Sequence, residues 1–537
     1  MSIGISDAER KNLGQYFTPI EVARFMCSLI TKPRDALVLE PCAGTGVFLT
    51  VLHSMGFRNI VAYEIDSKLP NRSPVRVEYR DFLTVEPVEK FDVVIGNPPY
   101  VRWRNIPEKW REMFRRSTYW SKVINGLSDL TYAFIYHSVN MLKPGGELIF
   151  ITPVFWMETV HGSKLRKHLL ERGHLELVVN LNEMRIFDEV SSTIVVFKYV
   201  KCRENKPIKV VKVHSKDKLT AHHLSRVQEL LRRLEAGADY VREGVYEAFL
   251  SPQFRSEEPW LPVPRVVAER NPLLRLNPAE HSSRLVLLGE IAEIGNGMVS
   301  GLDEAFRLSH SELKELNQAE REHIILVYKA HTLDRFHPAC DPIPYMYLND
   351  VESEEKLQSL LPHFYSKLLP YKARLLARYN YGRSIPWWHW VFPRNKHLFE
   401  RYTEKILVPS KERYDTKGYY RFTYVKGVYY ATQDVTVVCP KPSFREGALY
   451  LLALLNSEAY QEYILHRGFT RGGVYDFSEE PLSRIPVIKV DWNSIDEKRI
   501  HGDIVNLVNE IIRKRNWRKH ISELNALVSK LILRAFS

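Results

Sequence analysis

The 537-residue chain lacks the features that would place it in a membrane or outside the cell. It contains no run of 18 apolar residues, and its first residues, MSIGISDAERKN, are too polar for a secretory signal. Its five cysteines are scattered and include no CxxC pair, which argues against a disulfide framework and against a zinc site. We therefore expect a soluble cytoplasmic protein with no membrane segment and no bound metal.

Two common phosphate-binding signatures are also missing. The glycine-containing stretch EPCAGTG, residues 40–46, has no Gly-Lys-Ser/Thr, so it is not a P-loop. The third glycine of the dinucleotide fingerprint is absent too. Its two remaining glycines still allow a tight turn and a close approach of the backbone to a ligand, and the following helix offers its N-terminal amides.

The composition is that of a globular protein, with 45% hydrophobic and 26% charged residues. At 62.8 kDa the chain is too long for one ordinary core, so two or three domains are expected. The net charge of +12 and the pI near 9.2 indicate an anionic partner, although a merely basic surface would give the same total.

The first 200 residues alternate between strand-like and helix-like stretches. The strand-like runs are 36–41, 60–65, 75–82, 91–98 and 146–153, with helix-like runs at 47–56 and 132–146. This alternation predicts a parallel sheet with helices on both faces. The runs 176–183 and 193–200 are joined by a short loop, which predicts a hairpin that closes the edge of the sheet.

Acidic residues stand at the ends of the first three predicted strands. Glu40 ends the first, Glu64 the second, and Asp81 with Phe82 the third. Glu64 is placed to accept ribose hydroxyls, and Asp81 with Phe82 suits the amino group and edge of an adenine. Each acid alone could be a solvated carboxylate, but together they predict a nucleoside-type ligand beyond the strand ends.

In this order the motifs resemble those of the γ-class, TaqI-like N6-adenine DNA methyltransferases. The matching stretches are GQYFTP (14–19), LEPCAGTG (39–46), AYEID (62–66), RDF (80–82), NPPY (97–100), DLTYAF (129–134), LKPGG (142–146) and FDEVSSTIVVF (187–197). The resemblance implies an α/β fold with a Rossmann-like domain that depends on S-adenosylmethionine and has a mostly parallel, seven-stranded sheet. An α+β DNA target-recognition domain would follow.

The same resemblance implies a set of site residues. Those implied for binding S-adenosylmethionine are Thr18, Glu40, Cys42, Gly44, Gly46, Glu64, Ile65, Asp81, Phe82, Asn97 and Phe134. The catalytic motif comprises Asn97, Pro98, Pro99 and Tyr100. Tyr100 and Phe187 would face the target base, although Phe187 could instead be a core phenylalanine that precedes a strand.

The NPPY motif suits the methylation of an aromatic amine. Adenine N6 is a poor nucleophile because its lone pair is delocalised into the ring. The Asn97 side-chain oxygen and the Pro98 carbonyl can accept both amino hydrogens and leave the lone pair free to attack, and the two prolines stiffen the loop. Tyr100 offers a flat face to the base. A duplex hides N6, so the base must be flipped out.

The second half of the chain has a different character. We expect a catalytic domain over 1–240, a linker over 241–284 and a DNA target-recognition domain over 285–537. Residues 285–306, LVLLGEIAEIGNGMVSGLDEAF, resemble the start of the specificity domain in TaqI-like enzymes and in type I specificity subunits.

Residues 367–426 carry most of the excess positive charge, with 14 Lys and Arg against four Asp and Glu. Aromatic residues are interleaved with them, a composition that suits phosphates and base edges. The predicted DNA contacts are Arg383, Arg394, Trp387 and Trp388. The alternative is a solvated basic face over an aromatic core. A second basic cluster, RNWRKH, lies at 515–520.

These observations predict sequence-specific methylation of adenine N6 in double-stranded DNA, with base flipping, by the modification enzyme of a restriction–modification system. A separate cognate restriction endonuclease would be its functional partner. A fused restriction–modification enzyme is one alternative, but GQYFTP begins at residue 14 and leaves no room for a preceding nuclease. The other is an NPPY methyltransferase acting on RNA or on protein glutamine; the long basic second half disfavours a protein substrate.

Overall fold

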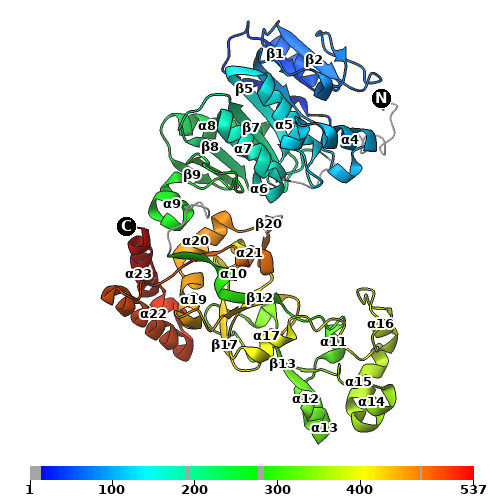
Figure 1. The fold of residues 1–537 in the computed structure, drawn as a ribbon, viewed down its shortest axis with the longest axis vertical. Coiled ribbons are helices and arrows are strands. Elements are labelled where there is room, and N and C mark those ends of the chain that lie inside the picture. The colour runs from blue at the N-terminus through cyan, green and yellow to red at the C-terminus, as the bar shows by residue number, and fades with distance from the viewer. Residues whose placement is uncertain (1–13, 183, 188–192, 276–283, 472–473, 537) are drawn as a thin grey trace. The chain divides into compact units, whose positions relative to one another are not determined.

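The computed structural model describes residues 14–182, 184–187, 193–275, 284–471 and 474–536. The chain forms two compact units, Met1–Arg270 and Asn271–Ser537 (Figure 1). Each unit has its own sheets and hydrophobic cores, as expected for a chain too long to fold around one core.

One sheet of ten strands runs through the first unit, in the order β3-β2-β1-β4-β5-β7-β6-β8-β10-β9. Its strands are β1 (Val38–Glu40), β2 (Ile60–Glu64), β3 (Glu78–Tyr79), β4 (Phe91–Gly96), β5 (Leu142–Pro153), β6 (His174–Asn180), β7 (Ile194–Val200), β8 (Ile208–Val213), β9 (Tyr240–Glu243) and β10 (Tyr246–Ser251). The five strands from β3 to β5 pair in parallel. The expected α/β fold with a large, mostly parallel sheet is confirmed.

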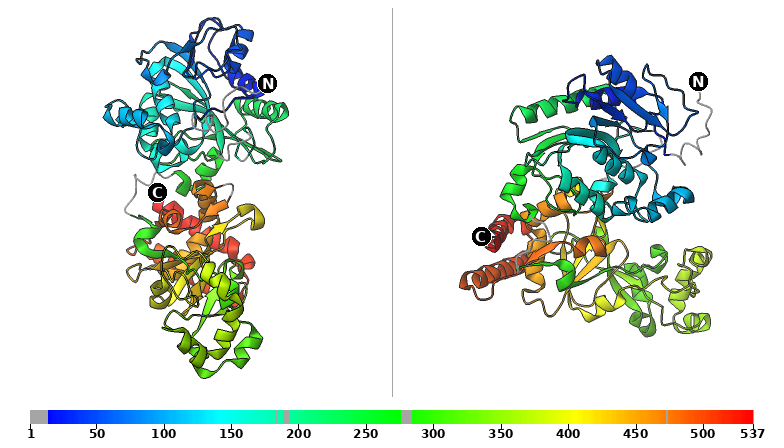
Figure 2. Two further views of the ribbon diagram at one scale, coloured as in Figure 1. Left: turned by 90° about the vertical axis from the view of Figure 1, so that its right-hand side faces the viewer. Right: turned by 45° about the horizontal axis from the view of Figure 1, so that its top comes forward.

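Helices cover both faces of this sheet. They are α2 (Ile20–Ser28), α3 (Val47–Ser54), α4 (Glu108–Arg116), α5 (Leu130–Met141), α6 (Phe155–Glu158), α7 (Ser163–Arg172), α8 (Ala221–Glu235) and α9 (Arg265–Arg270). In the left view of Figure 2, α8 lies on one side of the unit and α4 on the other.

Strand β5 shows why both faces need cover. Leu148 and Phe150 lie in the core that α5 and α7 share, and Ile149 and Ile151 lie in the core that α2, α3 and α8 share. All four side chains are fully buried. Successive side chains on a strand point to opposite faces, and a strand buried on both faces has a continuous apolar sequence.

The sheet differs from the expectation in its extent. Strands β6 and β7 form the expected antiparallel hairpin, but β7 inserts between β5 and β6, so the hairpin does not close the edge. Strands β8, β9 and β10 extend the sheet beyond the seven expected strands. Strands β9 and β10 fall at the start of the expected linker, 241–284, because the apolar stripe of α8 packs back onto the sheet and returns the chain beside β8.

The second unit is an α+β arrangement of short sheets and helices, as expected. A four-stranded antiparallel sheet has the order β12-β19-β15-β17, and β13 pairs with β14 and β18. The strands are β11 (Leu285–Leu287), β12 (Ala292–Asn296), β13 (Ile324–Tyr328), β14 (Ile343–Met346), β15 (Glu404–Pro409), β16 (Lys411–Glu412), β17 (Thr423–Lys426), β18 (Tyr430–Ala431), β19 (Val435–Pro440), β20 (Thr470–Arg471), β21 (Val474–Asp476) and β22 (Pro486–Ile488).

The helices of the second unit complete two cores, one beneath α19, α22 and α23 and one around α14 and α15. They are α10 (Leu288–Ile291), α11 (Asp303–Phe306), α12 (His310–Glu315), α13 (Gln318–Glu322), α14 (Glu354–Leu360), α15 (Pro362–Leu368), α16 (Lys372–Ala377), α17 (Lys396–Arg401), α18 (Tyr414–Lys417), α19 (Gly447–Asn456), α20 (Glu458–Arg467), α21 (Glu479–Ser483), α22 (Ile495–Lys514) and α23 (Trp517–Phe536). Across the described ranges, no helix has both the length and the apolarity needed to cross a bilayer.

Candidate active site

The predicted site residues of the first unit converge at the end of the sheet where strands β1, β2 and β4 have their carboxyl ends. Strand β1 pairs in parallel with β2 on one side and β4 on the other, so the carboxyl ends of the three strands lie side by side. The loop 41–46 follows β1, and the NPPY loop, 97–100, follows β4. In open α/β sheets the ligand binds beyond the carboxyl ends of the strands. The topology therefore assembles residues that are far apart in the sequence.

The loop after β1 is shaped by two glycines in the left-handed region. Gly44 has φ +54° and Gly46 has φ +84°, conformations that a residue with a β-carbon rarely adopts. Gly46 caps α3, and the Gly44 N–H donates to the Glu64 carboxylate at 2.8 Å. Glu64 also accepts from the Asp66 N–H at 2.9 Å. Glu64, at the end of β2, thus stabilises the conformation of the loop after β1.

Three carboxylates lie at this end of the sheet: Glu40 and Glu64 are buried, and Asp81 is half-buried. Glu40 is 1% exposed, and burial together with nearby Glu64 raises the pKa of Glu40 well above its usual range. Burial also raises the pKa of Glu64 and of Asp81, against the backbone N–H groups that donate to them. One oxygen of Glu40 and one of Asp81 receive no hydrogen bond from the part of the chain that the structure describes. Such buried acceptors indicate a ligand that brings donors or positive charge.

Aromatic rings line the neighbouring wall. Phe82 and Phe134, both predicted to contact the cofactor, lie with ring centroids 5.5 Å apart, and the His137 ring meets Phe82 edge-on at 4.7 Å. Ile65 is 57% exposed immediately after Glu64. The structure therefore brings Phe82 and Phe134 into contact, whereas Ile65 lies on the surface at the end of β2.

The thiol of Cys42 lies between the loop after β1 and the NPPY loop. Burial, together with Glu40 and Glu64, raises its pKa well above the usual range, and its Sγ donates to the Asn97 carbonyl at 3.1 Å. A protonated, donating thiol is a poor nucleophile. Cys42 thus acts as a small residue that joins the loop after β1 to the NPPY loop.

The NPPY loop is fixed by contacts from several elements. The Asn97 amide nitrogen donates to the Tyr16 carbonyl at 2.8 Å and to the Thr18 hydroxyl at 3.1 Å. The Thr131 hydroxyl donates to the Pro99 carbonyl at 3.1 Å, and the Tyr100 hydroxyl donates to the Ile151 carbonyl at 3.1 Å. Because the Tyr16 carbonyl can only accept, the orientation of the Asn97 amide is determined.

This orientation leaves the Asn97 side-chain oxygen buried but without a hydrogen-bond donor among the described residues. The oxygen is shielded from solvent and accepts no hydrogen bond from any residue with described coordinates. The Pro98 carbonyl likewise receives none of the hydrogen bonds that the structure describes. The two acceptors predicted to hold an amino group are therefore both available to a ligand.

Three aromatic rings gather beside these acceptors. Tyr100 and Phe187 are brought together as predicted, with centroids 6.1 Å apart, but at 72° they meet edge to face rather than as two parallel walls. Tyr16, which the sequence did not single out, stacks on Tyr100 at 5.4 Å and 29° and lies 5.7 Å from Phe187. Its position within GQYFTP, two residues before Thr18, is the signal that could have identified it.

The predicted DNA contacts in the second unit have different environments. Trp387 is 5% exposed and Trp388 is 7% exposed, and their indole nitrogens donate to Glu354 and to the Val351 carbonyl. These rings are core anchors with no free face for a base, so the prediction that they contact DNA needs correction. Arg394 is half-buried and donates through Nε to the Gly297 carbonyl at 2.9 Å, whereas Arg383 is exposed.

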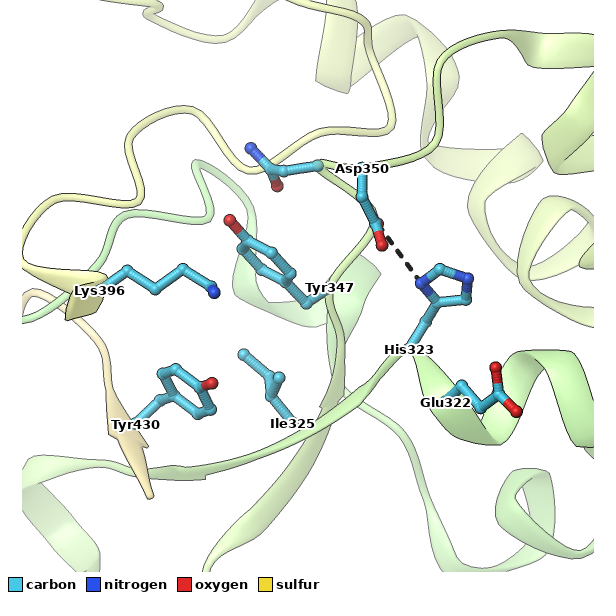
Figure 3. A pocket seen from close by; sticks show the side chains of 8 residues that line it. Glu322, His323, Ile325, Tyr347, Asp350, Lys396 and Tyr430 are labelled. Carbon is cyan, nitrogen blue, oxygen red and sulfur yellow. Dashed lines mark ion pairs between the residues drawn. The ribbon is translucent and has the colours of Figure 1, made fainter. Parts of the chain in front are cut away.

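A separate pocket in the second unit has a volume of about 380 Å³ (Figure 3). Lys396 lies over two of its tyrosines, 5.4 Å from the Tyr347 ring and 5.9 Å from the Tyr430 ring, and His323 lies 3.4 Å from Asp350. Glu322, Ile325 and Asn349 complete its lining. The nearby carboxylates disfavour a phosphate. Over the described part of both units, no group of three or more His, Cys, Asp and Glu is arranged to hold a metal ion.

Three family models match the chain. The N-6 DNA methylase model matches residues 5–67, the Eco57I restriction-modification methylase model matches 54–187, and the TaqI-like C-terminal specificity domain model matches 370–487. Among solved structures, that of the type IIL restriction-modification enzyme MmeI in complex with DNA has a TM-score of 0.56. The match covers 99% of this chain and 77% of that one, at 11% identity, and shows a shared fold.

Two full-length relatives are much closer in sequence. The type II methyltransferase M.HindII of Haemophilus influenzae is 34% identical, over 98% of this chain and 99% of its own. The type II methyltransferase M.HincII, also of Haemophilus influenzae, is 34% identical over the same shares. The resemblance drawn from the motifs is confirmed, and the chain belongs to the type II methyltransferases of restriction–modification systems.

Proposed function

We propose that this protein transfers a methyl group from S-adenosylmethionine to N6 of an adenine in a specific sequence of double-stranded DNA. The observation that carries the proposal is the Asn97 side-chain oxygen, a buried acceptor with a fixed direction and no donor among the described residues. An adenine amino group supplies the donors that this oxygen and the Pro98 carbonyl require.

The three carboxylates at the carboxyl ends of the strands, Glu40, Glu64 and Asp81, suit S-adenosylmethionine. The unsatisfied oxygen of Glu40 would take the ammonium group of the methionine end, Glu64 the ribose hydroxyls, and the unsatisfied oxygen of Asp81 the adenine amino group. Phe82, Phe134 and Ile65 would hold the adenine ring between apolar surfaces. When bound, the cofactor supplies an activated methyl group on its sulfonium.

The residues of this chain would then orient the amine and distribute its charge. Holding both amino hydrogens against Asn97 and Pro98 favours a pyramidal nitrogen whose lone pair points at the methyl carbon. Transfer of the methyl group from the sulfonium to N6 would leave positive charge on that nitrogen, beside these acceptors. The proton that N6 then loses passes to water. No covalent intermediate with the protein is needed.

Access to the amine requires the adenine to leave the duplex, and we propose that the second unit binds the flanking DNA. The exposed loop 379–383, within the stretch that matches the TaqI-like specificity domain, carries Arg383 and two exposed tyrosines. Tyr379 is 75% exposed and Tyr381 is 46% exposed. Because Arg394 is committed to a backbone carbonyl, Arg383 is the better candidate for a DNA contact.

The biological role follows from the reaction. Methylation of every copy of one sequence would protect the cell's own DNA from a separate endonuclease that cuts the same sequence. We therefore propose that the protein acts in the cytoplasm as the modification enzyme of such a pair.

One experiment tests both the methyl donor and the substrate that accepts the methyl group. The protein is incubated with labelled S-adenosylmethionine and, in separate reactions, with unmethylated genomic DNA, total RNA or a release factor. The products are digested and the labelled component is identified. We expect N6-methyladenine in DNA in a single sequence context. Label on RNA, on glutamine or on cytosine would contradict the proposal.

A further inference from the structure

The Tyr16 ring occupies a place next to the catalytic asparagine where an aromatic ligand would be expected. It stacks on Tyr100 at 5.4 Å and 29° and also contacts Phe187 at 5.7 Å. We infer that Tyr16 belongs to the target-base pocket, where its ring holds the place of the adenine until the flipped base displaces it. This inference rests on the proposed function, because it needs a planar base to enter beside Asn97.

The spacing of the two stacked rings leaves no room for a base between them. Stacked bases lie about 3.4 Å apart, so a base held between two parallel rings needs about 7 Å between those rings. Tyr16 and Tyr100 lie nearly parallel, with centroids only 5.4 Å apart. A base that stacks on this face of Tyr100 must therefore move Tyr16 first.

The backbone around Tyr16 is anchored to the NPPY loop. The Tyr16 carbonyl accepts from Asn97, and the Gly14 carbonyl accepts from the Tyr100 N–H at 3.3 Å. Gly14 has φ +62°, and a β-carbon there would lie 2.6 Å from the Val101 side chain, which permits this close approach only to glycine. Displacement of the ring alone would therefore leave in place the backbone contact that orients Asn97.

The neighbouring side chains tie the same segment to the cofactor side. The Phe17 ring lies beside Gly44, 3.9 Å from the position of a β-carbon, and the Gln15 amide donates to Asp66 at 3.3 Å. The segment 14–18 therefore spans the loop after β1 and the NPPY loop. A ring that leaves Tyr100 can do so while the cofactor side remains held.

Tyr16 is a weaker occupant than adenine for a specific reason. It stacks on Tyr100, but the Asn97 side-chain oxygen still receives no donor from it or from any other described residue. An adenine would provide the same stacking together with N6–H donors for Asn97 and Pro98. The exchange is thus favourable only for a base that carries an exocyclic amine in the right place, so Tyr16 also contributes to selectivity.

The test follows the entry of a base directly. A duplex with 8-vinyladenine, a fluorescent base that retains the 6-amino group, at the target position is mixed with the full-length protein in the presence of S-adenosylhomocysteine, and the fluorescence rise of the unstacked base is recorded by stopped flow. For Tyr16→Ala we expect a rate of base entry roughly 2- to 12-fold higher, the range that corresponds to the loss of one aromatic pair. Tyr16→Phe keeps the ring and should keep the slow entry. An unchanged or slower rate for Tyr16→Ala overturns the inference.

A second measurement avoids dependence on the folding of the alanine variant. With 3-fluorotyrosine at position 16 of the otherwise unchanged protein, the ¹⁹F resonance should shift when the target duplex is added and stay in place with a duplex that lacks the site. No shift with the target duplex overturns the inference. Methylation of the same duplex by the wild-type protein is measured alongside. Its absence refutes the proposed function, whereas normal methylation with no displacement of Tyr16 refutes this inference alone.

Discussion

At the scale of single residues, the direction of each hydrogen bond decides what the site can do. The Asn97 amide nitrogen is committed to the Tyr16 carbonyl and the Thr18 hydroxyl, so only its oxygen faces a ligand. The Cys42 thiol is committed as a donor to the Asn97 carbonyl. Substitution of Asn97 should therefore remove an acceptor for the target amine, whereas substitution of Cys42 should remove no group that takes part in bond formation.

Asn97→Ala should lower the rate of methyl transfer by on the order of 10²–10³, because it removes one preorganised acceptor for the amine. Cofactor affinity should be retained, since we expect this oxygen to act on the target amine rather than on the sulfonium. Single-turnover transfer of labelled methyl and calorimetric titration of the cofactor measure the two effects. Asn59→Ala is the matched control, because Asn59 donates to the Asp35 carbonyl before β2 begins. Near-normal transfer by Asn97→Ala would refute the assignment of the NPPY loop.

Glu64→Gln and Asp81→Asn should each weaken S-adenosylmethionine binding by roughly 10- to 100-fold, the range expected for a hydrogen bond to a charged group. Both lie on the cofactor side of the sheet, so DNA affinity should be unchanged. Calorimetry with the cofactor and a DNA mobility assay test the pair. Glu86→Gln, an exposed carboxylate near Asp81 in the sequence, serves as the control. Unchanged cofactor affinity would remove the residue from the site.

At the scale of an element, the basic and aromatic stretch 367–426 contains both buried and exposed segments. Residues 387–390 fold into the core, where the Trp390 indole donates to the Met346 carbonyl. Residues 379–383 remain on the surface, and Tyr381 (φ +57°) and Gly382 (φ +72°) form a left-handed turn at the tip. Arg378 links the two parts, since its guanidinium donates to the carbonyls of Ser300 and Trp387.

Arg383→Ala and Tyr379→Ala should weaken DNA binding without changing cofactor affinity. Arg383 lies over the Phe392 ring at 4.0 Å, and Tyr379 meets Tyr381 at 4.7 Å, so the loop presents charge and ring faces together. Loss of a phosphate contact weakens binding to all sequences and flattens the salt dependence, whereas loss of a base contact costs about 1–3 kcal/mol at one position.

Binding of these variants to cognate and scrambled duplexes at several salt concentrations separates the two mechanisms. Arg401→Ala is the control, since Arg401 belongs to the same window but pairs with Glu293 at 3.3 Å. If neither loop variant differs from the wild type, the recognition surface lies elsewhere in the second unit.

At the scale of the whole molecule, folding and charge are coupled to pH. Burial lowers the pKa of His168 to about 3, and the residue is 7% exposed beside the Tyr136 ring. The imidazole is therefore neutral in the folded protein, while in the unfolded chain it gains a proton below its ordinary pKa of about 6.5. Its contribution to stability is complete above that value and is lost as the pH falls from about 6.5 toward 3.

His168→Gln should therefore flatten the acid limb of the stability curve of the first unit. Between pH 7 and pH 5 the wild type should lose about 2 kcal/mol more than the variant, because 1.5 pH units below the unfolded pKa correspond to that free energy. Denaturant unfolding at both pH values measures the difference. Comparison with the variant cancels Glu40 and Glu64, whose raised pKa values act in the opposite direction. Equal pH dependence in both proteins would contradict the prediction.

Much of the catalytic unit could be predicted from the sequence because its rules are local. Apolar runs such as GELIFITP specify strands buried on both faces, and the carboxyl ends of parallel strands necessarily meet at one edge. That geometry brings Glu40, Glu64 and Asn97 together without any knowledge of long-range packing. The extent of the sheet was not predictable in this way, because β8 joins it by pairing with β6, and β9 and β10 join it only after α8 packs back onto the face.

The sequence by itself therefore determined the family, the α/β architecture and the order of the site residues along the chain. The tertiary structure alone decided which aromatic residues are exposed and which rings touch. Trp387 and Tyr379 stand eight positions apart in the same basic and aromatic stretch, yet one is 5% and the other 75% exposed, because burial depends on partners such as Glu354 and Tyr365 that lie elsewhere in the chain. Tyr16 and Tyr100 are likewise neighbours only because the 14–18 segment folds across the NPPY loop. The composition gives which side chains are present, whereas contacts between distant segments decide which of them are buried and which are exposed.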